Sequence, residues 1–510
     1  MRFLSGCCAA AAVMSVSAPA AASWNVAQSK HFVIYADDNP KHLTQFATQL
    51  ERFDQAVRYA TQMSDPEVGK ANRLTVFVVP TEKSVRSIMG DKTGFFAGFY
   101  TGRVAGSLAY VPRQLDHDAP DENAIFFHEY THHLMQQDLD RPYPQWFSEG
   151  FAEFFSTPEF ERDGSVWLGR VVLGRAYGLF YGPQLPLETL LQGMQPSMTN
   201  VQRDVFYGRS WLLTHYLELD SHRRGQLTAY LYAMAKGASS LEAARQVFGD
   251  LKQVDKELNL YETKPLLKFE VPASLIHIDP ITVTPLSAGG SQVILDRARI
   301  KYGVKPDEAE MIAARLRSVE NAYRGDELVE TTLGEAELEA GHAEAAEAAA
   351  DRALKNNSQS IGAIVLKGKA LSARADDLEG ETRHALFEQA RAQFIAANKL
   401  DTEDPDPLFE FYRTFTREGV RPNDNAIAAL HYASDLAPQD LGVRMNSAIA
   451  YLNEGKPKEA RAALTVVAYS PHGIEVADIA RHMIADIDGG KPKAALFEFR
   501  RSPSQGSTGH

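Results

Sequence analysis

The chain has 510 residues, of which 44% are apolar and 23% charged, and its formal net charge at pH 7 is −13. This length exceeds one ordinary hydrophobic core, so two or three globular domains are expected, and the composition excludes a disordered or fibrous chain. The acidic balance argues against a nucleic-acid partner or an anionic membrane partner, because both require a basic surface.

The first 22 residues have the features of a secretory signal peptide. Arg2 supplies a positive start, an alanine-rich apolar stretch follows, and Ala20 and Ala22 form an A-x-A cleavage site. We expect cleavage after Ala22 and secretion, most simply into a bacterial periplasm. The apolar run is short and weakly hydrophobic for an anchor, and no later segment predicts a transmembrane helix in the mature chain.

Both cysteines, Cys7 and Cys8, lie within this expected signal peptide. The mature chain is therefore expected to have no disulfide framework, no thiolate metal site and no cysteine nucleophile.

Residues 23–265 are predicted to form one α+β domain with a small mixed sheet plus helices. The pattern before the helical half predicts strands at 31–36 and 73–80, a helix at 43–62 and a glycine-rich hairpin at 98–111. From residue 123 to about residue 258 the apolar spacing is almost wholly helical.

The second half of the chain changes character twice. Residues 266–305 carry prolines, β-branched residues and a Gly-Gly pair, and they are interpreted as a connector with possible short strands. Residues 306–490 are alanine-rich and predicted to be all-α, and similar runs recur with a period in the mid-thirties. These runs resemble tetratricopeptide repeats with an insertion near residues 374–381, and a plain helical bundle is the alternative. Residues 491–510 are expected to be a disordered tail.

Residues 124–137, AIFFHEYTHHLMQQ, contain the pattern His128-Glu129-x-x-His132. Residues four apart on an α-helix lie on one face, about 40° from each other, so both imidazoles can bind one zinc ion. Glu129 can then reach a metal-bound water without being a ligand. His133 points roughly 140° away from His128, which makes it a poor second ligand.

Residues 143–158, YPQWFSEGFAEFFSTP, predict a short helix with Glu149 and Glu153 on one face. A zinc hydrolase needs three protein ligands and an open fourth position, and Glu149 completes a His, His, Glu set. Glu153 is then available to accept the outer N–H of a ligating imidazole. Two solvated carboxylates are the alternative, but four phenylalanines crowd this segment, and burying carboxylates among them is costly without a metal or partner.

The two segments together, HEYTH followed by WFSEGFAE, resemble the gluzincin metallopeptidases, and most closely the peptidase MA-like families, over residues 24–258. The resemblance implies a zincin-like catalytic domain that holds one zinc ion, with Glu149 as the third ligand and Glu153 as a partner of a zinc-binding histidine. It also implies that Tyr207 donates a hydrogen bond to the oxyanion, although a core tyrosine fits equally well. His215, two turns further along, is the alternative for that role.

One segment departs from the aminopeptidase-like members of this group. Their Gly-x-Met-Glu-Asn motif is missing, and the corresponding stretch reads GRVAGSLAYVPRQ. A standard aminopeptidase is therefore not expected, and the choice between endopeptidase and exopeptidase stays open. The predicted hairpin is either an edge strand for an extended peptide or a purely structural element.

These features together predict a secreted zinc metallopeptidase that acts on a peptide or protein substrate. Glu129 is the expected general base of a reaction with metal-activated water. The helical repeats are expected to recruit a substrate or a protein partner, or to cover the catalytic cleft. Two alternatives stay open: a non-catalytic, repeat-based binding protein with a vestigial zinc site, and a zinc hydrolase of a non-peptide amide bond.

Overall fold

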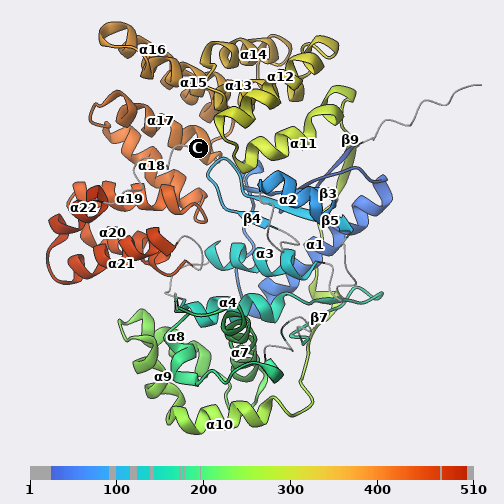
Figure 1. Ribbon diagram of the computed structural model, residues 1–510, viewed down its shortest axis with the longest axis vertical. Helices are drawn as coiled ribbons and strands as arrows, with labels where there is room; N and C mark the ends of the chain where they lie inside the picture. Colours follow the sequence, from blue (N-terminus) through green and yellow to red (C-terminus); the bar gives the residue numbers. More distant parts are fainter. Residues whose placement is uncertain are drawn as a thin grey trace, which may run out of the picture.

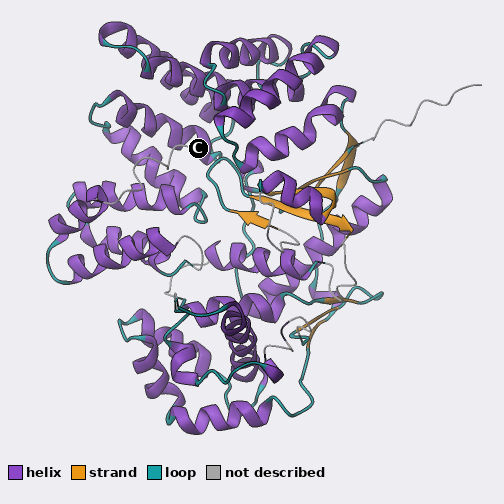
Figure 2. Ribbon diagram, viewed as in Figure 1, coloured by secondary structure: helices purple, strands orange, loops and turns teal. Residues whose placement is uncertain are grey.

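The computed structural model describes residues 24–90, 99–114, 123–137, 143–171, 175, 179–195, 197–470 and 474–501. The expected signal peptide and the first residue of the predicted hairpin, Gly98, lie outside this part of the chain. Figure 2 shows that helices dominate the molecule and that the strands gather mainly in one small sheet.

The sheet is mixed and has six strands in the order β4-β5-β3-β2-β1-β9. The strands are β1 (Asn25–Gln28), β2 (Phe32–Ala36), β3 (Leu74–Thr81), β4 (Phe99–Thr101), β5 (Leu108–Gln114) and β9 (Thr282–Pro285). β3 runs parallel to both β2 and β5, whereas β1, β4 and β9 pair antiparallel with their neighbours. The predicted small mixed sheet near the N-terminus is therefore confirmed.

Both faces of this sheet are covered, and successive side chains of its central strands point alternately into two different cores. Val76 of β3 packs into a core with helix α1 (Pro40–Thr61), whereas Phe77 packs against α2 (Glu82–Met89) and α11 (Ala288–Tyr302). Successive strand residues point to opposite faces, so a strand that is apolar throughout must lie between two layers. The run LTVFVVP meets that requirement.

Helices follow the sheet, as the sequence predicts for residues 123–258. They are α3 (Ala124–Gln137), α4 (Gln145–Phe155), α6 (Leu187–Leu191), α7 (Asn200–Leu219), α8 (Gln226–Ala235), α9 (Ser240–Phe248) and α10 (Leu251–Tyr261). A second, three-stranded sheet interrupts them, made of β6 (Glu159–Phe160), β7 (Val166–Leu168) and β8 (Phe269–Val271). We call residues 24–285 the N-terminal domain.

The predicted connector at 266–305 is only partly right. Short strands occur there, but β8 pairs with β7 and β9 pairs with β1, so both strands belong to sheets of the N-terminal domain. Residues 288–302 form helix α11, which covers the sheet through Ile294 and Ala298. Long-range strand pairing and packing decide these roles, and neither leaves a clear local pattern.

Residues 306–501 form a helical repeat array. Its helices are α12 (Pro306–Ala322), α13 (Glu327–Glu339), α14 (Ala343–Asn356), α15 (Ile361–Asp376), α16 (Gly380–Leu400), α17 (Pro405–Glu418), α18 (Asp424–Leu436), α19 (Leu441–Asn453), α20 (Pro457–Ala468), α21 (Ile474–Asp488) and α22 (Pro492–Arg501). Each helix packs on the next, and α13 also contacts α15, which contacts α17. This stacking of neighbours is that of a tetratricopeptide-like array, and a plain bundle is not what these helices form.

The turns within the helix pairs show the repeat most clearly. Each has one glycine with a positive φ: Gly341, Gly380, Gly419, Gly455 and Gly490. Only glycine adopts this left-handed conformation without a steric cost, so the glycines mark the same turn in successive repeats. The predicted insertion near residues 374–381 falls at the turn before α16.

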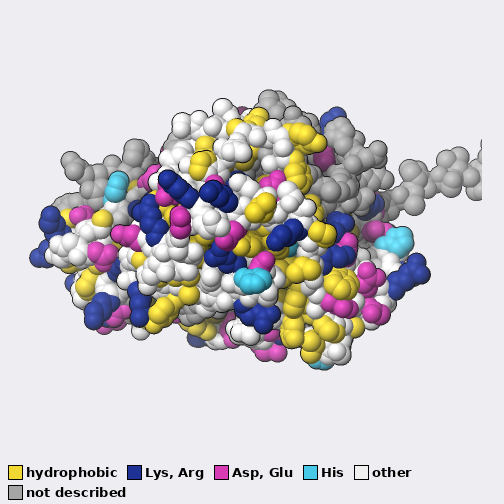
Figure 3. All heavy atoms as spheres, turned by 90° about the horizontal axis from the view of Figure 1, so that it is seen from below, with side chains coloured by type: hydrophobic (Ala, Val, Ile, Leu, Met, Phe, Trp, Pro, Cys, Tyr) yellow, Lys and Arg dark blue, Asp and Glu magenta, His cyan; other side chains and the backbone are white. Residues whose placement is uncertain are grey.

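The predicted disordered tail is wrong over its first half. Helix α22 occupies Pro492–Arg501, and it is held because Ala495 is fully buried in a cluster with Leu464 and Met483. Residues 502–510 lie outside the described part. Within the described residues, no helix is both long enough and apolar enough to cross a membrane. Figure 3 shows basic and acidic side chains interspersed over the face seen from below.

Candidate metal centre

Helix α3 carries the two predicted histidine ligands between the sheet and α4. Phe126, Phe127, Tyr130 and Leu134 bury it in the core of the N-terminal domain. His128 and His132, one turn apart, face α4, and His132 is only 1% exposed.

Helix α4 brings the carboxylates to the histidines because it approaches α7 very closely. A Cβ atom at Gly150 would collide with the carbonyl oxygen of Ser210 on α7. Glycine at this position therefore lets the two helix backbones touch. Glu149 and Glu153, on either side of this contact, are both only 3% exposed.

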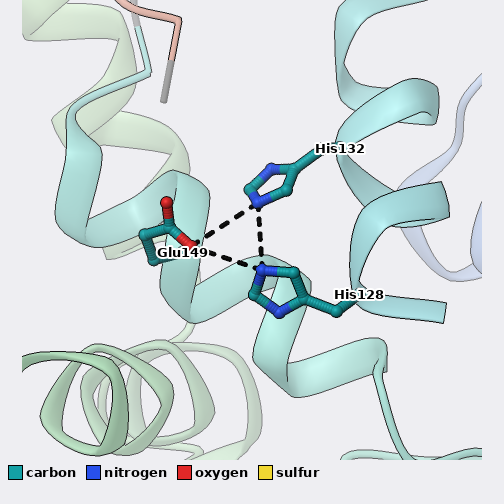
Figure 4. A group of neighbouring side chains, drawn as sticks. All are labelled: His128, His132 and Glu149. Carbon is teal, nitrogen blue, oxygen red and sulfur yellow. Dashed lines mark hydrogen bonds and ion pairs between the residues drawn. The ribbon is translucent and has the colours of Figure 1, made fainter. Parts of the chain in front are cut away.

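The three predicted ligands converge. His128 Nε2 lies 3.2 Å from His132 Nε2, and the same carboxylate oxygen, Glu149 Oε2, lies 3.4 Å from the first nitrogen and 3.5 Å from the second. Figure 4 shows the two rings on one helix and the carboxylate on the other pointing toward a common centre.

This triangle fits a zinc ion. Zinc in proteins is tetrahedral with ligands at about 2.0–2.2 Å, which places neighbouring ligand atoms about 3.3–3.6 Å apart. The three separations of 3.2, 3.4 and 3.5 Å are close to those of one face of such a tetrahedron. Two imidazoles and one carboxylate are also a ligand set of catalytic zinc sites, which leave a fourth position open.

The charges of the cluster are mutually dependent. Burial alone lowers the pKa of His128, but the hydrogen bond to Glu149 and the charges of Glu153 and Glu129 outweigh it and raise the pKa to about 9. Burial alone raises the pKa of Glu149, but its hydrogen bonds to His128 and His132 hold that pKa well below its usual range. The metal-free site therefore holds a proton on His128 at neutral pH, which a metal ion would displace.

Glu153 lies behind His128, as the sequence predicts. Its Oε1 is 3.5 Å from His128 Nδ1, on the side of the ring opposite the ligand atom. Arg175 donates two hydrogen bonds to the same oxygen, at 2.8 and 3.0 Å, and another to Asp204 at 2.9 Å. Sequence reasoning missed Arg175, because an isolated arginine in a helical region carries no local signal of this contact.

The structure distinguishes the two candidates for the oxyanion donor. The Tyr207 ring lies 6.3 Å from that of His128, under the guanidinium of Arg175. Burial and the charge of Glu149 raise the pKa of Tyr207, so its phenol keeps its proton. His215 lies apart from these residues, 2.9 Å from the Tyr261 hydroxyl and 3.0 Å from the Leu267 carbonyl oxygen. Burial lowers the pKa of His215 to about 4, so it is a neutral core histidine.

Glu129 and His133, also on α3, lie outside the triangle of candidate ligands. Glu129 is half-buried, and its charge raises the pKa of both His128 and Tyr207. His133 Nδ1 lies 2.7 Å from the Tyr100 hydroxyl on β4, and its Nε2 lies 2.9 Å from Gln137. Burial and the charge of Arg58 lower the pKa of His133 to about 3, so it binds the edge strand as a neutral ring.

A second buried cluster lies on the other side of α3. His31 Nδ1 is 2.7 Å from Glu51 and 3.4 Å from Asp54. Arg58 donates a hydrogen bond of 2.8 Å to Asp54, and the Tyr130 hydroxyl donates one of 2.7 Å. These contacts tie α1 to α3 and so fix the helix that carries the two candidate ligand histidines.

Comparisons with known proteins add little to this geometry. No protein-family model matches the chain, and no curated protein matches it. Among solved structures, the chain is similar to a thermophilic TPR protein of Thermus thermophilus, with 18% sequence identity and a TM-score of 0.30. That alignment covers 39% of this chain and 94% of the other.

Proposed function

We propose that this chain is a zinc-dependent hydrolase of peptide bonds, with the zincin-like architecture that the sequence resemblance implies. The observation that carries the proposal is the triangle of His128, His132 and Glu149, whose sides fit a tetrahedral zinc ion with one open position. When bound there, zinc supplies Lewis-acid chemistry and lowers the pKa of water toward about 7.

The chain's own residues would divide the remaining work. Glu129, next to the first ligand, acts as the general base that takes the proton of the attacking water and delivers it to the leaving nitrogen. Tyr207 keeps its phenolic proton and donates it in a hydrogen bond to the oxyanion, where charge develops only in the transition state. Glu153 orients His128, and Arg175 holds Glu153 in place.

The test combines metal analysis with peptide cleavage. Glu129→Gln keeps the shape of the side chain and removes the base, so we expect one bound zinc ion per chain and a loss of turnover of about 10²–10⁴-fold. Glu149→Ala removes a ligand and is expected to lose the metal together with the activity. Full activity in Glu129→Gln, or unchanged zinc content in Glu149→Ala, would contradict the proposal.

A second candidate is a binding protein whose helical array does the work and whose metal site is vestigial. The observation that favours it is the small size of the cavity beside His132, which measures about 20 Å³. Zinc binding without hydrolysis of any peptide in a library would support this candidate. A third candidate, hydrolysis of a non-peptide amide, has the same geometry and is separated by including such amides in the screen.

The proposal includes export. Residues 1–22 are expected to direct the chain out of a bacterial cytoplasm, and the peptide or protein substrate would then be periplasmic.

A further inference from the structure

The repeat array bends around the N-terminal domain and contacts it at separate places. Figure 1 shows the array running as an arc from α12 above the sheet, past the β4–β5 hairpin, to α20 and α21 near α3. At one contact the Asn72 side chain donates a hydrogen bond of 3.0 Å to the carbonyl oxygen of Glu403, in the turn before α17. Gly69 lies against the same residue.

The turn of the β4–β5 hairpin is inserted into the array. Val104, which is 9% exposed, belongs to the same hydrophobic cluster as Leu430 and Val443 on α18 and α19. Its backbone N–H donates a hydrogen bond of 2.7 Å to Asp440, the residue that caps α19. An apolar side chain of this domain therefore completes the core of the array.

The far end of the array lies against the candidate metal centre. Val466, Tyr469 and Ser470, at the end of α20, enclose a cavity whose other walls include His132 and Ser148. A volume of about 20 Å³ holds a water molecule, whereas pockets that bind ligands measure about 300–1,000 Å³. Among the described residues, the space between His132 and the array is therefore too small for a peptide.

We propose that the repeat array acts on its own chain, as a cover that closes the His132 side of the metal centre. Val104 holds the array in place by filling its core, and the end of α20 forms the cover itself. A long substrate reaches the centre only when this end of the array has moved away. The inference concerns the regulation of the proposed hydrolase site and rests on that function, but the closed contact is measurable without any activity.

The first experiment measures access to His132 by carbethoxylation of the full-length, metal-free protein with diethyl pyrocarbonate, read residue by residue with mass spectrometry. His222, whose side chain is 89% exposed, reports the unhindered rate, and buried His215 reports unfolding. We expect His132 to react at least about tenfold more slowly than His222. Equal rates at the two histidines would overturn the proposal.

Two variants then weaken the cover at two different places, the end of α20 and the β4–β5 hairpin. Tyr469→Ala removes part of the cavity wall, and Val104→Asp places a charge in the apolar core that holds the hairpin. We expect His132 to react severalfold faster in both, while His215 stays protected. The matched control is Tyr432→Ala, which removes a similarly exposed tyrosine from α18. In this variant we expect His132 to react at the rate of the wild type.

The outcomes separate this inference from the proposed function. If neither variant exposes His132 beyond the level of Tyr432→Ala, the array is not a cover, whatever the protein catalyses. If His132 becomes reactive and zinc-loaded Tyr469→Ala cleaves a denatured protein severalfold faster but a tetrapeptide no faster, the cover regulates a peptidase. If His132 becomes reactive and no form of the protein cleaves peptides, the contact is real and the proposed function fails.

Discussion

Among the residues that the structure describes, two buried clusters join histidine to carboxylates, and they differ in what else reaches them. Around His31, Nδ1 lies 2.7 Å from Glu51 and 3.4 Å from Asp54, and Asp54 also accepts hydrogen bonds from Arg58 at 2.8 Å and from the Tyr130 hydroxyl at 2.7 Å. Around Glu149, the described partners are two imidazoles whose nitrogens lie 3.4 and 3.5 Å away.

The difference concerns the source of the positive charge. In the first cluster, a permanent guanidinium and the Tyr130 hydroxyl each donate a short hydrogen bond to Asp54, so both of its oxygens have fixed partners without a metal ion. The second cluster depends on protons on imidazoles, which a metal ion can replace. In this molecule the carboxylates that an arginine reaches, Asp54 and Glu153, have a fixed cationic partner, whereas Glu149, whose described partners are two imidazoles, is the candidate metal ligand.

The largest expected effect is a lower free energy of unfolding of the protein when the first cluster is disrupted. Asp54→Ala leaves Arg58 buried without its main partner, and arginine does not release its proton, so we expect a destabilisation of about 3–5 kcal/mol. Guanidinium denaturation of the metal-free protein measures it. Glu149→Ala is the matched removal in the second cluster and is expected to cost clearly less, because His128 becomes neutral. Equal losses in the two variants would mean that both clusters are structural networks.

The next largest effect is a pH dependence of the stability that the second cluster contributes to the protein. The pKa of His128 is raised to about 9 from 6.5, so its stabilisation is fully present below pH 6.5 and is lost as the pH rises through 9. This corresponds to a loss of about 3 kcal/mol of unfolding free energy in the metal-free protein. The measurement is a denaturation series from pH 6 to 10 in chelator, in which the difference between the wild type and His128→Gln isolates the contribution.

Zinc should reverse the sign of this pH dependence, because only the neutral imidazole is a ligand. With saturating zinc, the stabilisation by the metal is expected to increase over the same pH range. The pKa of His31 is also raised, by its hydrogen bond to Glu51 and by Asp54 against the opposing effect of burial, so its stabilisation also falls as the pH rises. The contribution of His31 to the pH dependence of stability should not change when zinc is added. A metal-free protein that becomes more stable between pH 6.5 and 9 relative to His128→Gln would contradict the assignment.

The smallest effect concerns the residue behind the ligand. Glu153→Gln removes the negative charge that faces His128 Nδ1 at 3.5 Å, and we expect zinc affinity to fall about 10–100-fold, which is about 1.4–2.7 kcal/mol. A competition titration against a chromogenic chelator measures it, with exposed Glu344→Gln as the control. Unchanged zinc affinity would show that Glu153 serves only as the partner of Arg175 and does not orient His128.

The ligand set could be predicted because helical geometry is local. His128 and His132 share a face on any α-helix, and the same holds for Glu149 and Glu153. The N-terminal strands and the repeat period are equally predictable, because burial leaves a regular spacing in the sequence. In contrast, the local pattern predicts a connector where β8, β9 and α11 lie, since the partners of these elements are far away along the chain.

The amino-acid pattern alone shows which residues share a helix face and which side chains have the chemistry of a metal ligand. Packing between distant segments sets the spacing between α3 and α4, the contact of Arg175 with Glu153 and the position of the end of α20 beside His132. The reason is that periodicity encodes direction around one element, whereas the distance between elements depends on packing between residues far apart in the chain.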